Sequence, residues 1–247
     1  MKNALRPLVA ALALASGCAE TPTQPAAGTP APARTPTGSQ AQTRAPTPAL
    51  TSLTIPTPSS VEALFRSIAD GDFDAFSRFI NDGVQVSTRN ELGETPLYVA
   101  AEKGQLEIAK LLIAKGADAK ALTPNGETVL HAASMIESST LMAALIEAGA
   151  EINAANRDGE TPLHWAAMTG TFLAVKALAD AGADLDAQDL RTGNTALHAA
   201  ASHNDIVLIH YLLSKNVRTD IRNNNGLTAL ELARAGGRAS AVRLLEQ

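Results

Sequence analysis

The sequence has very little cysteine: Cys18 is the only one among its 247 residues. A disulfide within the chain is therefore excluded, and any folded part must be stable through packing alone. Basic residues are also in deficit, because residues 59–247 carry 16 basic and 24 acidic side chains. A domain without a basic stripe binds nucleic acid poorly, so we expect no nucleic-acid partner.

Long apolar runs and catalytic signatures are missing as well. The apolar run near the N-terminus, residues 8–14, is far shorter than the ~20 apolar residues that a membrane-spanning helix needs. No serine elbow, phosphate-binding glycine loop or His-Glu-x-x-His pair occurs. The sequence thus predicts no catalytic residue, no cofactor and no enzyme activity.

What the sequence does contain is a repeated phrase that opens with threonine. Its five copies begin 33, 33, 34 and 33 residues apart, at Thr95, Thr128, Thr161, Thr195 and Thr228. Threonine is a favoured helix N-cap, and a proline follows it at Pro96 and Pro162, where the first helical turn accepts proline. A period of this length indicates stacked units that are each too small to fold alone.

Two registers of glycine and asparagine predict where the helices end. One comprises Gly71, Gly104, Glu137, Gly170, Asn204 and Gly237, and the other Gly83, Gly116, Gly149, Gly182 and Asn216. These residue types stop helices in a left-handed conformation, so each unit is expected to contain two helices. Glu137 is the exception, because a left-handed glutamate costs ~1–2 kcal/mol relative to glycine unless its loop is reshaped. We therefore expect Glu137→Gly to stabilise the fold.

The repeated phrase identifies a family resemblance. Residues 95–100 read Thr-Pro-Leu-Tyr-Val-Ala and residues 161–166 read Thr-Pro-Leu-His-Trp-Ala. They resemble the ankyrin repeat, whose hallmark is Thr-Pro-Leu-His-x-Ala in a unit of about 33 residues. The resemblance implies an all-α repeat solenoid of about six stacked ankyrin units, each a helix-turn-helix with a β-turn finger. The units are expected at 59–88 (N-terminal cap), 89–122, 123–155, 156–188, 189–222 and 223–247 (C-terminal cap).

Three histidines recur at the repeat interval: His131, His164 and His198. Stacked helices lie ~8–10 Å apart, whereas zinc needs its nitrogen ligands at ~2 Å, so equivalent histidines cannot share a metal ion. We expect each to bond nearby backbone, and we expect no metal site. Trp165 occupies the slot held by valine, alanine or leucine in other units, so it either fills the core or serves as a partly exposed binding anchor.

Residues 1–17 contain two basic residues, Lys2 and Arg6, in their first six positions, continue into the short apolar run and end in small residues. This pattern predicts a bacterial export signal. Cys18 directly follows Ser16-Gly17, an arrangement that resembles the lipobox of bacterial lipoproteins. The resemblance implies that Cys18 becomes the lipidated first residue of the mature protein, carrying palmitate. The alternative is ordinary cleavage after Ala15 or Gly17, which leaves a free cysteine.

Residues 18–58 are expected to form a disordered stalk. From Glu20 to Pro58 there is no aromatic residue, and ten of the 39 residues are threonine and nine are proline. Such a segment cannot bury enough apolar surface to fold. Because alanine rather than aspartate follows Cys18, the outer membrane is favoured over the inner one. We expect a monomeric protein that is lipid-anchored in the bacterial cell envelope and faces the periplasm.

The ankyrin resemblance also implies where a partner binds, because that family contacts partners through its fingers and the exposed ends of its first helices, on a concave face. The residues at those positions are Glu94, Glu102, Lys103, Glu127, Met135, Ile136, Arg157, Asp158, Glu160, Met168, Thr169, Leu190, Arg191, Ser202 and His203. Among them, Glu94, Glu127 and Glu160 form an acidic row, and Met135, Ile136 and Met168 an apolar centre. The alternative is a solvated charge row beside scattered apolar side chains.

The predicted function is that of a non-enzymatic protein–protein interaction module that binds a periplasmic or envelope protein. Two specific forms are open: an immunity or inhibitor protein against a toxin or envelope enzyme, and a stress-protection scaffold. A passive structural spacer is a further alternative. A small-ligand receptor or an enzyme is disfavoured, because either needs convergent polar groups and the sequence offers only repeat-phased residues.

Overall fold

The computed structural model describes residues 58–247; the predicted signal peptide, Cys18 and residues 18–57 of the predicted stalk lie outside this range. Within it, helices follow one another in pairs. The first helices of the pairs are α2 (Pro58–Asp70), α4 (Pro96–Glu102), α6 (Val129–Ala133), α8 (Pro162–Thr169), α10 (Ala196–His203) and α12 (Ala229–Ala235). The second helices are α3 (Phe73–Asn81), α5 (Leu106–Ala114), α7 (Ser139–Glu147), α9 (Phe172–Asp180), α11 (Ile206–Ser214) and α13 (Ala239–Leu245).

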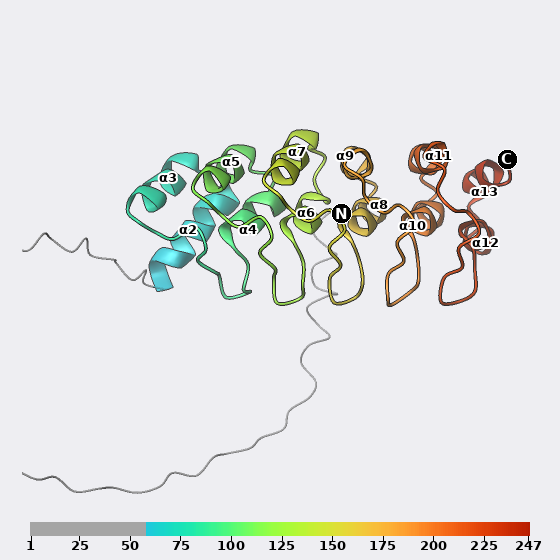
Figure 1. The fold of residues 1–247 in the computed structure, drawn as a ribbon, viewed down its shortest axis with the longest axis horizontal. Helices are drawn as coiled ribbons and strands as arrows, with labels where there is room; N and C mark the ends of the chain where they lie inside the picture. Colours follow the sequence, from blue (N-terminus) through green and yellow to red (C-terminus); the bar gives the residue numbers. More distant parts are fainter. Residues whose placement is uncertain (1–57) are drawn as a thin grey trace, which may run out of the picture. The chain divides into compact units, whose positions relative to one another are not determined.

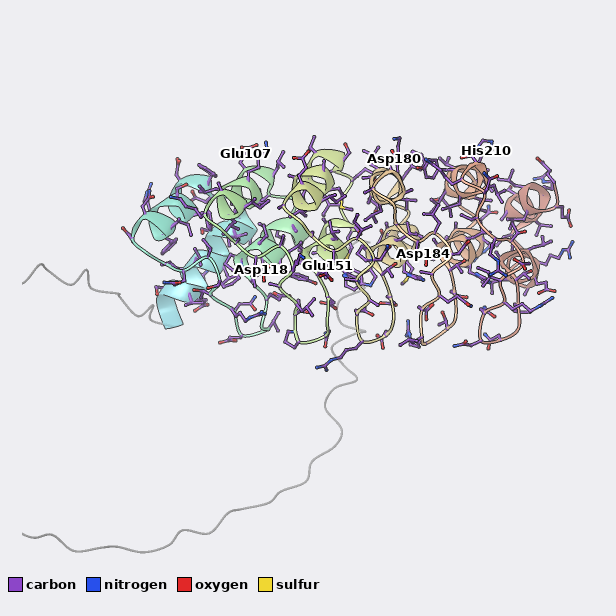
Figure 2. All side chains as sticks on the ribbon, viewed as in Figure 1. Glu107, Asp118, Glu151, Asp180, Asp184 and His210 are labelled. Carbon is purple, nitrogen blue, oxygen red and sulfur yellow. The ribbon has the colours of Figure 1, made fainter. Side chains whose placement is uncertain are left out.

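The pairs stack side by side in two rows, one of first helices and one of second helices (Figure 1). Long loops between the pairs project beyond the row of first helices. Figure 2 shows Glu107, Asp180 and His210, all exposed, on the row of second helices, away from these loops. The prediction of an all-α solenoid of about six units is confirmed.

The repeated threonines begin the first helices, as predicted. Each of the five lies at an N-cap with extended backbone angles. The hydroxyl oxygen of Thr95 accepts a hydrogen bond from the Tyr98 backbone N–H at 3.2 Å. Such a cap contributes about 1 kcal/mol to helix stability. The phrase therefore marks helix starts because its first residue satisfies an amide that the helix leaves unpaired.

The leucine of the phrase supplies the core between the two rows. Leu97, Leu130, Leu163 and Leu197 are each no more than 2% exposed. Burying one leucine side chain stabilises the fold by about 1.5–3 kcal/mol. The alanines that follow are buried as well, and their small side chains let neighbouring first helices approach closely.

The glycine register predicts the helix ends at all positions except Glu137. Asn204, for example, ends α10 with φ +56°, whereas Glu137 does not adopt a positive φ. Instead, α6 stops early, at Ala133, and the loop before α7 is reshaped. Of the two alternatives for Glu137, the left-handed conformation is therefore wrong and the reshaped loop is confirmed.

Glu137 has a different role, in capping the next unit. Its Oε1 accepts a hydrogen bond from the backbone N–H of Leu173, in the first turn of α9, at 2.9 Å. Asn204 does the same for α13, because its Oδ1 accepts from the Ala241 N–H at 3.0 Å. The expected stabilisation by Glu137→Gly consequently loses its basis, since glycine would remove a cap and relieve no strain.

No helix within residues 58–247 combines the length and the apolar character required to cross a membrane.

Candidate functional site

Five loops between the units form the fingers, and a backbone hydrogen bond closes the base of each. The first residue donates to the carbonyl of the last in fingers 90–94, 123–127, 156–160, 189–194 and 223–227, at 2.9–3.0 Å. Finger 189–194 has one residue more than the others. The added residue, in the stretch that contains Leu190 and Arg191, accounts for the 34-residue interval between Thr161 and Thr195.

Neighbouring fingers are also linked near their tips. Backbone N–H groups donate to carbonyls of the preceding finger in three cases: Arg157 to Asn125 (3.0 Å), Leu190 to Asp158 (2.8 Å) and Asn224 to Thr192 (2.8 Å). The corresponding position in finger 123–127 is Pro124, which has no N–H and cannot make the link. The side chain of Arg89 spans that junction instead, because its Nη1 donates to the Leu122 carbonyl at 2.9 Å.

A histidine in each of three units joins its own helix start to the next finger. Nδ1 of His131 accepts from the Thr128 backbone N–H at 3.0 Å, and Nε2 donates to the Glu160 carbonyl at 2.9 Å. His164 and His198 repeat the arrangement. A backbone N–H only donates and a carbonyl only accepts, so these contacts require the neutral tautomer with hydrogen on Nε2. The expectation that the histidines bond backbone is confirmed.

The environment of His131 and of His198 favours the neutral ring. Burial, with a smaller effect from His164, lowers the pKa of His131 to about 4, and burial also lowers the pKa of His198.

The His131 ring packs edge-on against Trp165, with ring centroids 5.3 Å apart. Trp165 itself is half-buried, and its Nε1 donates to Glu160 Oε2 at 2.9 Å. Trp165 thus packs between units and stays partly exposed, and its use as a binding anchor remains a prediction.

The carboxylates of the predicted acidic row are engaged within the stack. Glu94 is 7% exposed and accepts from Asn90 Nδ2 at 2.8 Å. Glu127 accepts from the Tyr98 hydroxyl of the preceding unit at 2.9 Å. Burial raises the pKa of Tyr98 far above its usual range, and the charges of Glu127, Glu94 and Glu102 raise it further. Tyr98 therefore stays protonated and donates, and this part of the row holds units together.

Five residues of the predicted partner-binding set come together in one hollow between the fingers and the first helices. These are Glu160, Met168, Arg191, Ser202 and His203. The remaining lining comes from His164, Asp189, Thr192, Asn194, Thr195 and Ala199. The hollow has a volume of ≈ 170 Å³. We call it the Ala199 hollow and the surface formed by fingers and first helices the groove face.

Other members of the predicted set lie elsewhere. Met135 and Ile136 are half-buried in the reshaped loop after α6, and Ile136 packs against Gly104 of the preceding unit. Met168 is 38% exposed and lines the hollow, so the three residues do not form one equally exposed apolar centre. The set outside the hollow comprises Glu94, Glu102, Lys103, Glu127, Met135, Ile136, Arg157, Asp158, Thr169 and Leu190.

The repeat register contains a signal for the floor of the hollow that sequence reasoning did not use. Ala199 occupies the slot held by Val99, Ala132, Trp165 and Leu232 in other units. A small residue beside the large Trp165 leaves space, and that comparison of side-chain volumes could have located the hollow. Among residues 58–247, no three His, Cys, Asp or Glu side chains gather as metal ligands would.

Comparisons with known proteins agree with this architecture. Residues 113–189 and 174–247 match the family described as ankyrin repeats (3 copies), and residues 80–133 match ankyrin repeats (many copies). The crystal structure of the ankyrin repeat domain of Bcl-3, described as a unique member of the IkappaB protein family, is similar with a TM-score of 0.66 and 30% identity. The similarity covers 74% of this chain and 84% of that one.

Curated relatives match over one short region each. The E3 ubiquitin-protein ligase KEG of Arabidopsis thaliana is 42% identical over 59 residues, 24% of this chain and 4% of the ligase. Protein phosphatase 1 regulatory subunit 27 of Homo sapiens is 33% identical over 63 residues, 26% of this chain and 41% of the subunit. The chain thus spans less than half the length of these relatives. The family matches run from residue 80 to residue 247, and the paired helices stack behind the fingers. The chain therefore belongs to the ankyrin-repeat family.

Proposed function

We propose that this protein is a non-enzymatic interaction module whose groove face binds another protein. The observation that carries the proposal is the Ala199 hollow, in which residues from two fingers and two first helices converge. Its ≈ 170 Å³ is below the about 300–1,000 Å³ of typical small-molecule sites, so it suits a side chain better than a cofactor. Fingers closed at their bases provide a rigid frame, which reduces the entropy lost on binding.

We also propose that the module works in the cell envelope. The export signal at residues 1–17 and the lipobox-like Cys18 support attachment to a membrane, with the outer membrane favoured. The proline- and threonine-rich residues 18–58 support a stalk that holds the repeats away from the lipid surface. The partner is then a periplasmic or envelope protein.

A substitution on the groove face tests the binding proposal. Met168→Asp places a charge on an exposed rim of the hollow, and we expect it to reduce recovery of the bound partner at least tenfold. The measurement is affinity capture of the full-length protein from detergent-solubilised envelopes, with bound proteins quantified by mass spectrometry. Val207→Asp on α11 is the matched control, because Val207 is an apolar residue, 64% exposed, on the row of second helices. Equal recovery by both variants would reject the groove face.

The anchor is tested separately at Cys18. Wild-type protein is expected to incorporate labelled palmitate and to sediment with membranes, and Cys18→Ala is expected to lose both properties while keeping its helical circular dichroism. The reason is that thioether lipidation requires this thiol, and the chain has no other cysteine. An unlabelled wild-type protein would instead indicate ordinary cleavage after Ala15 or Gly17.

A further inference from the structure

We propose that the Ala199 hollow receives one apolar side chain of the partner, and that a partner carboxylate next to it binds Arg191. This inference rests on the proposed function and specifies the chemistry of the segment that the groove face recognises. Three observations carry it: the size of the hollow, the rigidity of its rim and the state of its charged groups.

The size of the hollow suits a single large side chain. The hollow has a volume of ≈ 170 Å³, and its floor is formed by Ala199, which is 8% exposed. In three of the four other copies a larger side chain fills the same slot, namely Val99, Trp165 and Leu232, and in the fourth copy the residue is Ala132. An apolar side chain of the partner would complete the stack as those residues do from within. A side chain that is fully buried in this way acts as a central anchor, and such anchors contribute most of the binding energy of protein interfaces.

The rim of the hollow is held rigidly by finger 189–194. The carboxylate of Asp189 accepts from the Thr192 N–H, the Thr192 hydroxyl and the Asn194 N–H. From the next finger, Asn224 Nδ2 donates to the carbonyls of Leu190 and Arg191 at 3.3 and 3.2 Å. A longer loop would ordinarily be more mobile, but these bonds fix its backbone. The hollow is therefore formed before a partner arrives, which lowers the cost of binding.

The exposed cation at the rim of the hollow is Arg191. The carboxylate of Asp189 accepts three hydrogen bonds, and Glu160 Oε2 accepts from Asn156 and Trp165, so these oxygens are engaged within the stack. Arg191, by contrast, is 66% exposed, and its ion pair to Glu160 Oε1 is long at 3.8 Å. A partner carboxylate can bind this guanidinium in the bidentate geometry that arginine prefers.

A peptide-display selection tests the inference. Full-length protein, purified in detergent, is used to select from a random twelve-residue peptide library. The expected outcome is enrichment of peptides in which Leu, Met or Phe stands within two residues of Asp or Glu. For an enriched peptide, Ala199→Leu is expected to weaken binding at least tenfold by filling the hollow, and the fold should accept it because Leu232 occupies the same slot.

The charge is tested by a swap. Arg191→Glu is expected to weaken binding of the acidic peptide about fivefold or more and to bind better the same peptide with Lys in place of its acidic residue. The control is Arg78→Glu, the same change at an exposed arginine of α3, which should alter neither affinity. Unchanged affinity in Ala199→Leu, a basic consensus, or no enrichment would each overturn this inference. The groove-face proposal would still be judged by Met168→Asp, so the two failures are distinguishable.

Discussion

Lowering the pH from 7 to 4 is expected to reduce the free energy of unfolding by about 3 kcal/mol through His131 alone. Burial lowers the pKa of His131 to about 4, whereas in the unfolded chain it is near 6.5. Between these values the unfolded chain binds a proton that the folded chain does not, so stability rises with pH across this window and falls on acidification. The protonated ring would also turn an Nδ1–H toward the Thr128 N–H, which is a donor as well.

The test is urea denaturation followed by circular dichroism at pH 7, 6, 5 and 4. His131→Gln is expected to be less stable at pH 7 and to show a shallower dependence on pH. His210→Gln is the control, because His210 is exposed on the row of second helices and its loss does not disturb the stack (Figure 2). Equal pH dependence in wild type and His131→Gln would contradict the assignment. His198, whose pKa is also lowered, is expected to add to the wild-type slope.

Gly159→Ala is expected to destabilise the protein by about 3 kcal/mol. Gly159 has φ +75°, a conformation that costs an alanine about 1–2 kcal/mol. In addition, the new Cβ would lie 2.6 Å from the backbone nitrogen of Leu190 in the adjoining finger. Relieving that overlap adds about 1–3 kcal/mol, as overpacking does in cores. Shifting the finger would also strain the hydrogen bond from the Leu190 N–H to the Asp158 carbonyl.

Gly226→Ala provides the matched control for this prediction. Gly226 occupies the same place in its own finger with φ +73°, and a Cβ there would meet nothing within 4 Å. This variant is expected to lose only the conformational part, about 1–2 kcal/mol, in the same denaturation experiment. The difference between the two variants therefore measures the contact between fingers 156–160 and 189–194. Equal losses would show that this contact is not tight.

Most of the fold could be predicted from the sequence because its signals are local. A threonine that caps its own helix, and a glycine that ends it, act within a few residues, so their period reveals the units. Glu137 was misread for the opposite reason. Its carboxylate caps α9 through Leu173, which lies 36 residues ahead, and no local pattern contains that bond.

The candidate site was predicted only in part, for the same physical reason. Register placed Met168, Arg191 and His203 on one face, and the structure brings them together in the hollow. Register could not show that Glu127 is bound by Tyr98, 29 residues before it, because that contact depends on how two units pack. The floor of the hollow depends on the small size of the Ala199 side chain. A sequence pattern of polar and apolar residues does not reveal an empty volume of this kind.

Pro124 has a mechanical consequence for the stack. Three tip junctions share a backbone hydrogen bond, but the junction between fingers 90–94 and 123–127 has none and relies on the side chain of Arg89. In a linear array each unit is supported only by its neighbours, so tension is resisted junction by junction. Under tension along the stack, these two finger tips are therefore expected to separate before the other three pairs. Fingers 156–160 and 189–194, which border the hollow, keep a backbone bond between them.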